Sequence, residues 1–282
     1  MITATIPQAN HLLAALPGTE FQRLMPHLER MTMPLGQVLC EPGVTPDHVY
    51  FPTSAIITLL HLTEEGESTE IAIVGNDGMV GIAQFMGGGF STTRAVVEGA
   101  GEGFRLNAET FKQVFNRPGP AMALLMRYTQ ALIAQMAQTA VCNRHHSVDQ
   151  QICRLLLQSL DRLQGSEVVI TQELIATLLG VRRESVTDRA RRLQRAGLIR
   201  YSRGHVHVLD RDGIEQRSCE CYAVVKREYQ RLLPESRRET TDGAEGLFQR
   251  HSFPGVSGSP PRTSTYRPMQ WPAVERRSSV RA

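Results

Sequence analysis

The order of apolar and polar positions divides the chain into stretches of different character. Over residues 35–106, short apolar runs rich in β-branched residues alternate with turn residues, which is typical of β-strands. Over residues 119–146 and most of 147–235, apolar residues recur every three or four positions, which predicts helices. The chain is therefore predicted to be an α+β protein, with a β-rich N-terminal part and a mainly helical C-terminal part.

Six short strands are predicted in the β-rich part. Residues 56–62 and 68–74 flank residues 63–67, a polar loop containing glycine that suits a β-hairpin. Many short strands separated by Gly-rich turns favour a double-stranded β-roll or small barrel. The other predicted strands are residues 38–40, 49–51, 96–97 and 104–106.

Helical spacing occurs in several other segments. Residues 20–31 place apolar side chains on one face, and a long helix is predicted over residues 120–145. Ser147, with Gln150 three residues later, forms the capping-box pattern and is expected to start another helix. Residues 211–233 are predicted to form a single helix.

Residues 170–199 carry the most specific pattern in the chain, ITQELIATLLGVRRESVTDRARRLQRAGLI. Thr171 suits the N-cap of a short first helix, because its hydroxyl can accept from a backbone N–H. Gly180 suits the end of that helix, and Gly197 the end of a second one. The spacing is that of a DNA-binding helix-turn-helix. The inward-facing positions are Leu174, Ile175, Leu178, Leu179, Val186, Ala190 and Leu193.

Arginine dominates the second of these helices and the segment after it. Eight arginines lie from Arg182 to Arg203, against the two acids Glu184 and Asp188. Arginine pairs bidentately with guanine edges and with phosphates, so the bias favours a DNA-binding surface. A charge run alone would favour an ordinary solvated basic face, and it is the combination with the glycine spacing and the apolar periodicity that favours DNA. Residues 198–201 and 206–209 are predicted to pair as a wing, and Arg203 at its tip either reaches a phosphate or lies in solvent.

The long helix carries an imperfect coiled-coil seam interrupted by threonine. Such a seam indicates a homodimer, which a palindromic DNA site would require. The alternative is a core helix that packs on the chain's own β-rich part. The predicted seam residues are Met122, Leu125, Thr129, Leu132 and Met136, flanked by Met126, Ile133 and Ala140.

A glycine-rich loop follows the predicted hairpin, over residues 76–89. Its glycines either let bare backbone N–H groups approach a ligand or only make turns.

Cysteine and histidine occur close together at residues 142–146. Cys142 and His145 or His146 are spaced so that both could face one ion. No second cluster lies nearby, and Cys219 and Cys221, two apart on a predicted helix, would point in different directions. The spacing therefore favours a structural or hinge role for these residues, with no metal ion and no cofactor.

Composition sets the outer limits. The chain has 282 residues and a net charge of +3, so its basic character is local. No apolar run approaches the roughly 20 residues of a membrane helix, and the first residues lack the pattern of a signal peptide. Five scattered cysteines fit reduced thiols and a cytoplasmic location. Residues 236–282 are rich in Pro, Ser and Arg and are expected to be disordered.

A β-roll, a long helix and the 170–199 motif followed by a wing together resemble the Crp/Fnr superfamily of bacterial transcription regulators. The segment LGQVLCEPGVTPDHVYFPTSAIITLL is also similar to that family's cyclic-nucleotide-binding roll. The resemblance implies a homodimer that binds double-stranded DNA and contacts RNA polymerase. It divides the chain into a sensory roll (12–118), a dimerisation helix (119–146), a winged helix-turn-helix (147–213), a C-terminal helix (214–235) and a tail (236–282).

The resemblance also suggests residue roles. The family's recognition helix presents an Arg-Glu pair to base edges, which falls here on Arg183 and Glu184. Ser185 and Asp188 are weaker candidates for base contacts. Candidate phosphate contacts are Thr171, Arg182, Arg189, Arg191, Arg192 and Arg203.

Two known effector sites of the family do not match this sequence. Gly81-Ile82 stands where cyclic-AMP binders have Gly-Glu, Ser91-Thr92 stands on their Arg-Ser, and Arg94 is out of register. A buried phosphate without a cation would be costly, so the sequence disfavours cyclic AMP. No cysteine precedes Cys40, which disfavours the family's N-terminal iron–sulfur cluster. The tentative effector loop comprises Gly78, Gly81, Ser91 and Thr92.

The sequence thus predicts a DNA-binding regulator whose roll senses an unidentified signal. A constitutive DNA-binding protein with a silent roll remains the alternative. An enzyme is disfavoured, because no nucleophile–base pair or phosphate loop has specific spacing.

Overall fold

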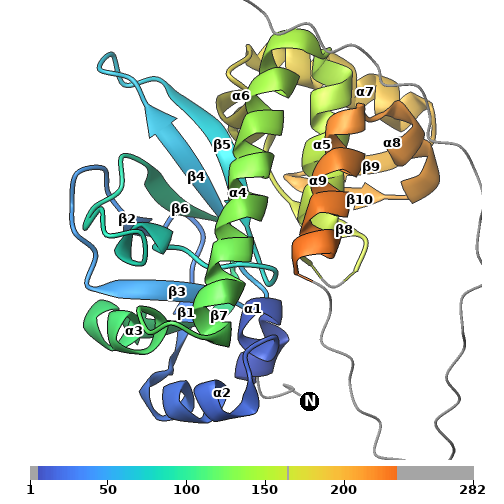
Figure 1. Cartoon of the computed structure of the whole chain (residues 1–282). Coiled ribbons are helices and arrows are strands. Elements are labelled where there is room, and N and C mark those ends of the chain that lie inside the picture. The colour runs from blue at the N-terminus through green and yellow to red at the C-terminus, as the bar shows by residue number, and fades with distance from the viewer. Residues whose placement is uncertain (1–5, 164, 234–282) are drawn as a thin grey trace, which may run out of the picture. The chain divides into compact units, whose positions relative to one another are not determined.

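The computed structural model describes residues 6–163 and 165–233 and confirms the α+β class (Figure 1). The predicted tail, residues 236–282, lies outside the described residues. A β-roll is followed by the long helix α4, and a small third sheet accompanies the C-terminal helices.

The roll consists of two antiparallel sheets, with strand orders β1-β7-β3 and β2-β6-β4-β5. All six predicted strands are present. The predicted hairpin is β4–β5, paired from Ile57 opposite Val74 to Leu62 opposite Ser68, with a shift in register between Leu59 and Leu60. The bounds are β1 Glu29–Met33, β2 Val38–Cys40, β3 His48–Pro52, β4 Ile56–Leu62, β5 Ser68–Val74, β6 Arg94–Gly99 and β7 Gly101–Asn107.

Strand β1 corrects the helix predicted over residues 20–31. Helix α2 covers only Gly18–Leu24, and a single 3-10 turn, Met25–His27, leads into the strand. Pro26 cannot donate a helical hydrogen bond, so the helix is weak at this point. Strand β7 then supplies an antiparallel partner, with Glu29 and Arg105 opposite each other and ion-paired at 2.7 Å. Non-local strand pairing therefore outweighs the local helical spacing. Two short elements precede α2, the 3-10 turn Pro7–Ala9 and helix α1, His11–Ala14.

Helix α4, Pro120–His145, closes the core of the roll. It follows α3, Ala108–Phe115, whose N-cap is Asn107. The α4 side chains Leu124, Leu125, Tyr128 and Leu132 are all buried in the roll core, between 0 % and 3 % exposed.

The C-terminal part packs around helix α5, Val148–Leu160, which begins with the predicted capping box. The Gln150 side chain accepts from the Ser147 backbone N–H at 3.0 Å, and Ser147 Oγ accepts from the Gln150 N–H. The third sheet has strand order β8-β10-β9. The remaining bounds are α6 Gln172–Leu179, α7 Arg183–Arg195, α8 Arg211–Arg217, α9 Glu220–Leu232, β8 Glu167–Val169, β9 Ile199–Ser202 and β10 His205–Val208.

The prediction of a single helix over residues 211–233 is wrong, because the helix is interrupted between α8 and α9. Ser218 and Cys219 both have extended backbone there. The Ser218 backbone N–H and hydroxyl both donate to the Glu215 carbonyl, at 3.2 and 3.0 Å, and so cap the end of α8. Apolar spacing continues across this break, which is why the sequence pattern did not reveal it.

Two buried arginines join α5 and the residues after it to the roll. Arg154 on α5 is 1 % exposed, and its Nη2 lies 3.6 Å from Glu70 Oε1 on β5. Arg162 Nη2 lies 2.8 Å from Asp77 Oδ2, in the loop after β5. Removing one partner of a buried ion pair leaves an uncompensated charge and typically costs about 3–5 kcal/mol.

A second carboxylate lies near this charge cluster. Burial raises the pKa of Glu70, and the neighbouring Arg154 opposes that change. Glu98 on β6 is half-buried, and its burial together with the negative charge of Glu70 raises the pKa of Glu98 to about 7. The folded chain thus holds a proton on Glu98 that the unfolded chain releases at lower pH. The free energy of unfolding must therefore fall as the pH rises from about 4.5 to about 7.

We predict that Glu98→Gln removes this share of the pH dependence. The variant should be more stable than the parent at pH 8, by about 1–2 kcal/mol after allowance for solvent screening. Denaturant unfolding at pH 5 and pH 8 measures the difference. Glu65→Gln, at an exposed position of the β4–β5 loop, is the matched control and should leave the pH dependence unchanged. An unchanged pH dependence in Glu98→Gln would contradict the assignment.

Candidate nucleic-acid interface

Helices α6 and α7 form the predicted helix-turn-helix. Thr171 is the N-cap of α6, and its hydroxyl accepts from the Leu174 N–H at 3.1 Å. Gly180 ends α6 with φ +63°, in the left-handed region that glycine enters without strain. The Val181 N–H then returns to the Ala176 carbonyl at 3.0 Å, which closes the turn.

Helix α7 buries one narrow face and exposes the rest. Val186, Ala190 and Leu193 are at most 5 % exposed and pack in the core shared with α5 and α6. Because these positions follow one another at i, i+4 and i+7, the opposite face must point to solvent. The exposed residues are Arg183, Glu184, Asp188, Arg191, Arg192, Gln194 and Arg195.

The predicted Arg-Glu pair lies in the first turn of α7. Arg183 is the first helical residue, and its Nε lies 3.5 Å from Glu173 Oε2 on α6. Both side chains are more than 60 % exposed, so solvent screens this ion pair. Glu184 has no hydrogen-bond or ion-pair partner within residues 6–163 and 165–233. Ser185, the next candidate, is half-buried. The start of a recognition helix is the part that contacts bases in helix-turn-helix proteins, and both charged groups are available there.

Other predicted contact residues already have partners in the chain. Asp188 Oδ2 lies 3.0 Å from Arg192 Nη2, one turn further along α7. Arg189 is only 32 % exposed, and its Nη1 lies 3.2 Å from Asp149 on α5. The geometry thus favours a structural role for Arg189, whereas Arg182 and Arg191 remain exposed without ion-pair partners among the described residues.

The wing is a two-residue hairpin between β9 and β10, with Ser202 opposite His205. Arg203 and Gly204 form its turn with φ +49° and +85°. Two consecutive positive φ angles are the pattern of a type I′ turn, which matches the twist of paired strands. Arginine is unusual at such a position, because a left-handed backbone costs a non-glycine residue roughly 1 kcal/mol. The exposed Arg203 is thus held at the wing tip.

Several residues that support this surface were not singled out from the sequence. Thr187 on α7 donates to Gln172 Oε1 on α6 at 2.6 Å and fastens the two helices together. Asp149, at the start of α5, holds Arg189. Both contacts join residues from different helices, so no local pattern reveals them.

The structure corrects the predicted seam of α4. Leu125 and Leu132 are 0 % and 3 % exposed within the chain's own core, so they are not available to a second chain. Met136 also packs partly against that core. The large apolar side chains that α4 leaves exposed are Met126 and Ile133, 56 % and 51 % exposed, together with Val141. Met126 and Ile133 were flanking positions of the predicted seam, and the roll core buries the face that the heptad spacing favoured.

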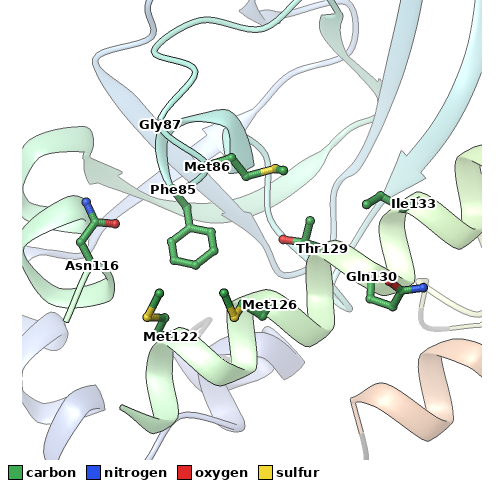
Figure 2. A pocket seen from close by; sticks show the side chains of 9 residues that line it. All are labelled: Phe85, Met86, Gly87, Asn116, Met122, Met126, Thr129, Gln130 and Ile133. Atoms are coloured by element: carbon green, nitrogen blue, oxygen red, sulfur yellow. The ribbon is translucent and has the colours of Figure 1, made fainter. Parts of the chain in front are cut away.

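An open hollow of about 670 Å³ lies beside this exposed stripe. Figure 2 shows Phe85 pointing from the roll toward Met122 and Met126 of α4. The two remaining predicted seam residues, Met122 and Thr129, line this hollow. The full lining is Phe85, Met86, Gly87, Asn116, Met122, Met126, Thr129, Gln130 and Ile133.

The tentative effector loop is largely engaged in the chain's own packing. A Cβ on Gly78 would lie 2.6 Å from the Tyr128 ring, and one on Gly81 would lie 2.9 Å from Val49. Gly78 thus lets α4 approach the roll, where the Tyr128 hydroxyl donates to the Met79 carbonyl at 2.7 Å.

The serine and threonine positions of the loop offer no cation for a phosphate. Ser91 Oγ lies 2.7 Å from Thr93 Oγ1, and Thr92 is exposed. Arg94 is ion-paired with Glu41 at 3.0 Å. This arrangement supports the sequence-based argument against a cyclic phosphate.

The cysteine and histidine positions show one clear difference from expectation. Cys219 lies before α9 rather than on it, so its thiol reaches the same point as that of Cys221. Cys142 and His146 meet them there, while His145 is exposed. The Cys142 thiol and the backbone N–H of Cys221 act as hydrogen-bond donors and hold the pKa of Cys219 below its ordinary value. The hydrogen bond that the Cys142 thiol makes to Cys219, together with burial, raises the pKa of Cys142.

No helix within residues 6–163 and 165–233 is both long enough and apolar enough to cross a membrane. Two family models match the chain. The cyclic nucleotide-binding domain matches residues 30–118, and the Crp-like helix-turn-helix domain matches residues 150–217. No curated protein sequence matches this one.

Solved structures with the same fold are regulators of one type. A crp/fnr family protein from Eubacterium rectale superposes with a TM-score of 0.58 at 19 % identity, over 74 % of this chain and 98 % of that one. A CRP/FNR family regulator from Thermus thermophilus has a TM-score of 0.54 at 20 % identity, over 67 % and 98 %. The c-di-GMP responsive global regulator CLP of Xanthomonas campestris has a TM-score of 0.54 at 17 % identity, over 68 % and 99 %.

At these identities the structural likeness shows the fold, and the two domain matches extend it to the family. One chain combines a roll of the cyclic nucleotide-binding type with a Crp-like helix-turn-helix. The protein is therefore a Crp/Fnr-like transcription regulator, with a cyclic nucleotide-binding domain and a Crp-like helix-turn-helix domain in one chain.

Proposed function

We propose that the protein is a homodimeric regulator that reads a palindromic DNA site and couples a signal in its roll to that binding. The observation that carries this proposal is the first turn of α7, where Arg183 and Glu184 are exposed on a helix held rigidly by α5 and α6. Arg183 can donate to O6 and N7 of guanine, and Glu184 can accept from N4 of cytosine. RNA polymerase is the second partner that family resemblance suggests.

Phosphate contacts would surround this base-reading pair. Arg182, Arg191 and Arg203 are exposed and lack ion-pair partners among the described residues, so binding a phosphate would break no existing contact. Thr171 and Arg192 border the same surface. Arg203 at the wing tip is suited to the DNA backbone beside the groove that α7 enters.

The proposed dimer joins two copies of α4 through the stripe of Met126, Ile133 and Val141. These large apolar side chains are exposed in the single chain and lie on one side of the helix. A two-fold axis along α4 would place two α7 helices in successive major grooves, about 34 Å apart. The hollow between Phe85 and α4 borders this stripe, so a ligand bound there would act directly on the dimer geometry.

One observation favours a second possibility, a roll that senses nothing. Gly78 and Gly81 are tightly packed against Tyr128 and Val49, and Arg94 is paired with Glu41, so these residues of the tentative effector loop already have partners within the chain. A constitutive regulator would bind its promoters whether or not the cell's signals change.

The test of the proposed function is selection of DNA by the purified full chain from a random pool at a stated salt concentration. The expected result is an enriched palindrome whose half-sites are about 10 base pairs apart, because two α7 helices would read them together. Recovery of one unrepeated half-site, or of no motif, would contradict the dimeric reader.

Arg183→Ala should weaken binding to the selected site by roughly 1–3 kcal/mol and leave binding to random DNA nearly unchanged, because a base contact is lost. Arg203→Asn is the contrasting variant, since asparagine tolerates a left-handed backbone. Arg203→Asn should weaken binding to the selected site and to random DNA equally, and it should reduce the slope of log affinity against log salt concentration by about one unit. Titrations at several salt concentrations distinguish the two. Equal losses on both DNAs for Arg183→Ala would make Arg183 a phosphate contact.

Ile133→Asp should convert the dimer to a monomer, because two buried carboxylates would face each other across the proposed seam. Sedimentation velocity measures the result. Leu35→Asp is the matched control, since Leu35 is similarly exposed (58 %) but lies on the roll away from α4. A dimeric Ile133→Asp variant would place the subunit contact elsewhere.

A further inference from the structure

A compact group of metal-ligand side chains lies where α4 meets α9. Cys142 is in the last turn of α4, His146 is the residue that ends it, and Cys219 and Cys221 stand at the start of α9. Their Sγ and ring nitrogen atoms all lie within 4.8 Å of one another. The three cysteines are 0 %, 3 % and 0 % exposed and form a buried cluster of their own.

Two of the donor–donor distances match the edges of a single-ion tetrahedron, and all of them are within 4.8 Å. Metal–sulfur bonds of about 2.3 Å and metal–nitrogen bonds of about 2.0 Å give edges of roughly 3.5–3.8 Å. The Sγ atoms of Cys142 and Cys219 are 3.5 Å apart, and Cys221 Sγ is 3.5 Å from His146 Nδ1. A disulfide would need about 2.05 Å. An iron–sulfur cluster places iron and sulfide between the thiolates and would hold them further apart.

The surroundings orient the donors as metal sites do. His146 presents Nδ1 to the cysteines, and its Nε2 lies 3.2 Å from the Glu220 carboxylate. A carboxylate on the second ring nitrogen fixes the tautomer that leaves the first free to bind a metal. The buried Gln151 amide donates to the carbonyls of Cys142 and His146, at 3.2 and 2.9 Å, and so holds both α4 donors in place.

A buried cation lies close to such a site. Three thiolates with a divalent cation carry a net charge of about −1. The Arg154 guanidinium, which also faces Glu70, donates to the Thr139 hydroxyl, three residues before Cys142 on α4, at 3.4 Å. Cysteines that served only as small apolar side chains would not require a histidine nitrogen and a carboxylate beside them.

We propose that Cys142, His146, Cys219 and Cys221 bind one tetrahedral divalent cation of the zinc type. The ion would join the end of α4 to the start of α9, immediately before the Ser147 cap of α5. It would thus fix the junction between the dimer helix and the DNA-binding part of the chain. The proposal is independent of the DNA sequence that the protein reads.

The test uses the full chain, purified under reducing conditions and freed of metal, and titrated with Co²⁺ and then Zn²⁺. The expected result is one Co²⁺ per chain, with thiolate charge-transfer bands and the intense visible bands of a tetrahedral ion, displaced by one Zn²⁺. Cys219→Ser should abolish these bands. Cys40→Ser, which changes a buried cysteine on β2, is the matched control and should leave them unchanged.

Glu220→Gln provides a second variant that does not disturb the core, since the Glu220 side chain is 71 % exposed. It should weaken Zn²⁺ binding by about 10–100-fold, because the orienting carboxylate is lost. Circular dichroism confirms that each variant is folded. Weak octahedral cobalt bands, binding that survives in Cys219→Ser, or a Cys142–Cys219 disulfide whose reduction yields no metal uptake would each overturn the proposal.

Discussion

The burial of one face of α4 against the roll is the contact on which the rest of the structure depends. Leu124, Leu125 and Leu132 enter the roll core, and each fully buried side chain of this size contributes roughly 1.5–3 kcal/mol. Tyr128 approaches so closely that only a glycine fits at position 78. Because this face is occupied, the large apolar side chains that the helix can offer to a second chain are those of the exposed stripe of Met126, Ile133 and Val141.

The two functional parts of the chain are joined by polar contacts as well as by apolar packing, in which Leu60 and Val96 of the roll share a core with α5. The C-terminal end of α4 meets the buried Arg154, which also faces Glu70 of the roll. Buried ion pairs contribute little net stability, but breaking one is costly, so they restrict the arrangements that two packed parts can adopt. A charged junction of this kind favours a few defined arrangements of the roll and the DNA-binding part over continuous sliding of one against the other. That suits a regulator in which the arrangement of the two parts matters.

The DNA-binding surface combines a rigid scaffold with exchangeable charges. Val186 and Leu193 fix α7 in the core, whereas the Arg183–Glu173 pair at its start is exposed and screened. Replacing that ion pair by a contact between Arg183 and a DNA base therefore costs little free energy. Arg189 differs, because its pairing with Asp149 is partly shielded from solvent and holds α7 on α5. Arginines that look alike in the sequence thus divide into binding and structural groups.

Local patterns in the sequence determined most secondary structure and the helix-turn-helix, because strand alternation, helix caps and turn glycines act over a few residues. Thr171, Gly180 and the Ser147–Gln150 capping box needed no distant partner. Tertiary structure decided what depends on contacts between distant segments. Residues 29–33 form a strand because β7 pairs with them, and Leu125 and Leu132 are buried in the core of the roll. Cys142 and Cys219 are 77 positions apart, and their thiols meet because the helix is interrupted before α9. Helical spacing in the sequence does not predict that interruption.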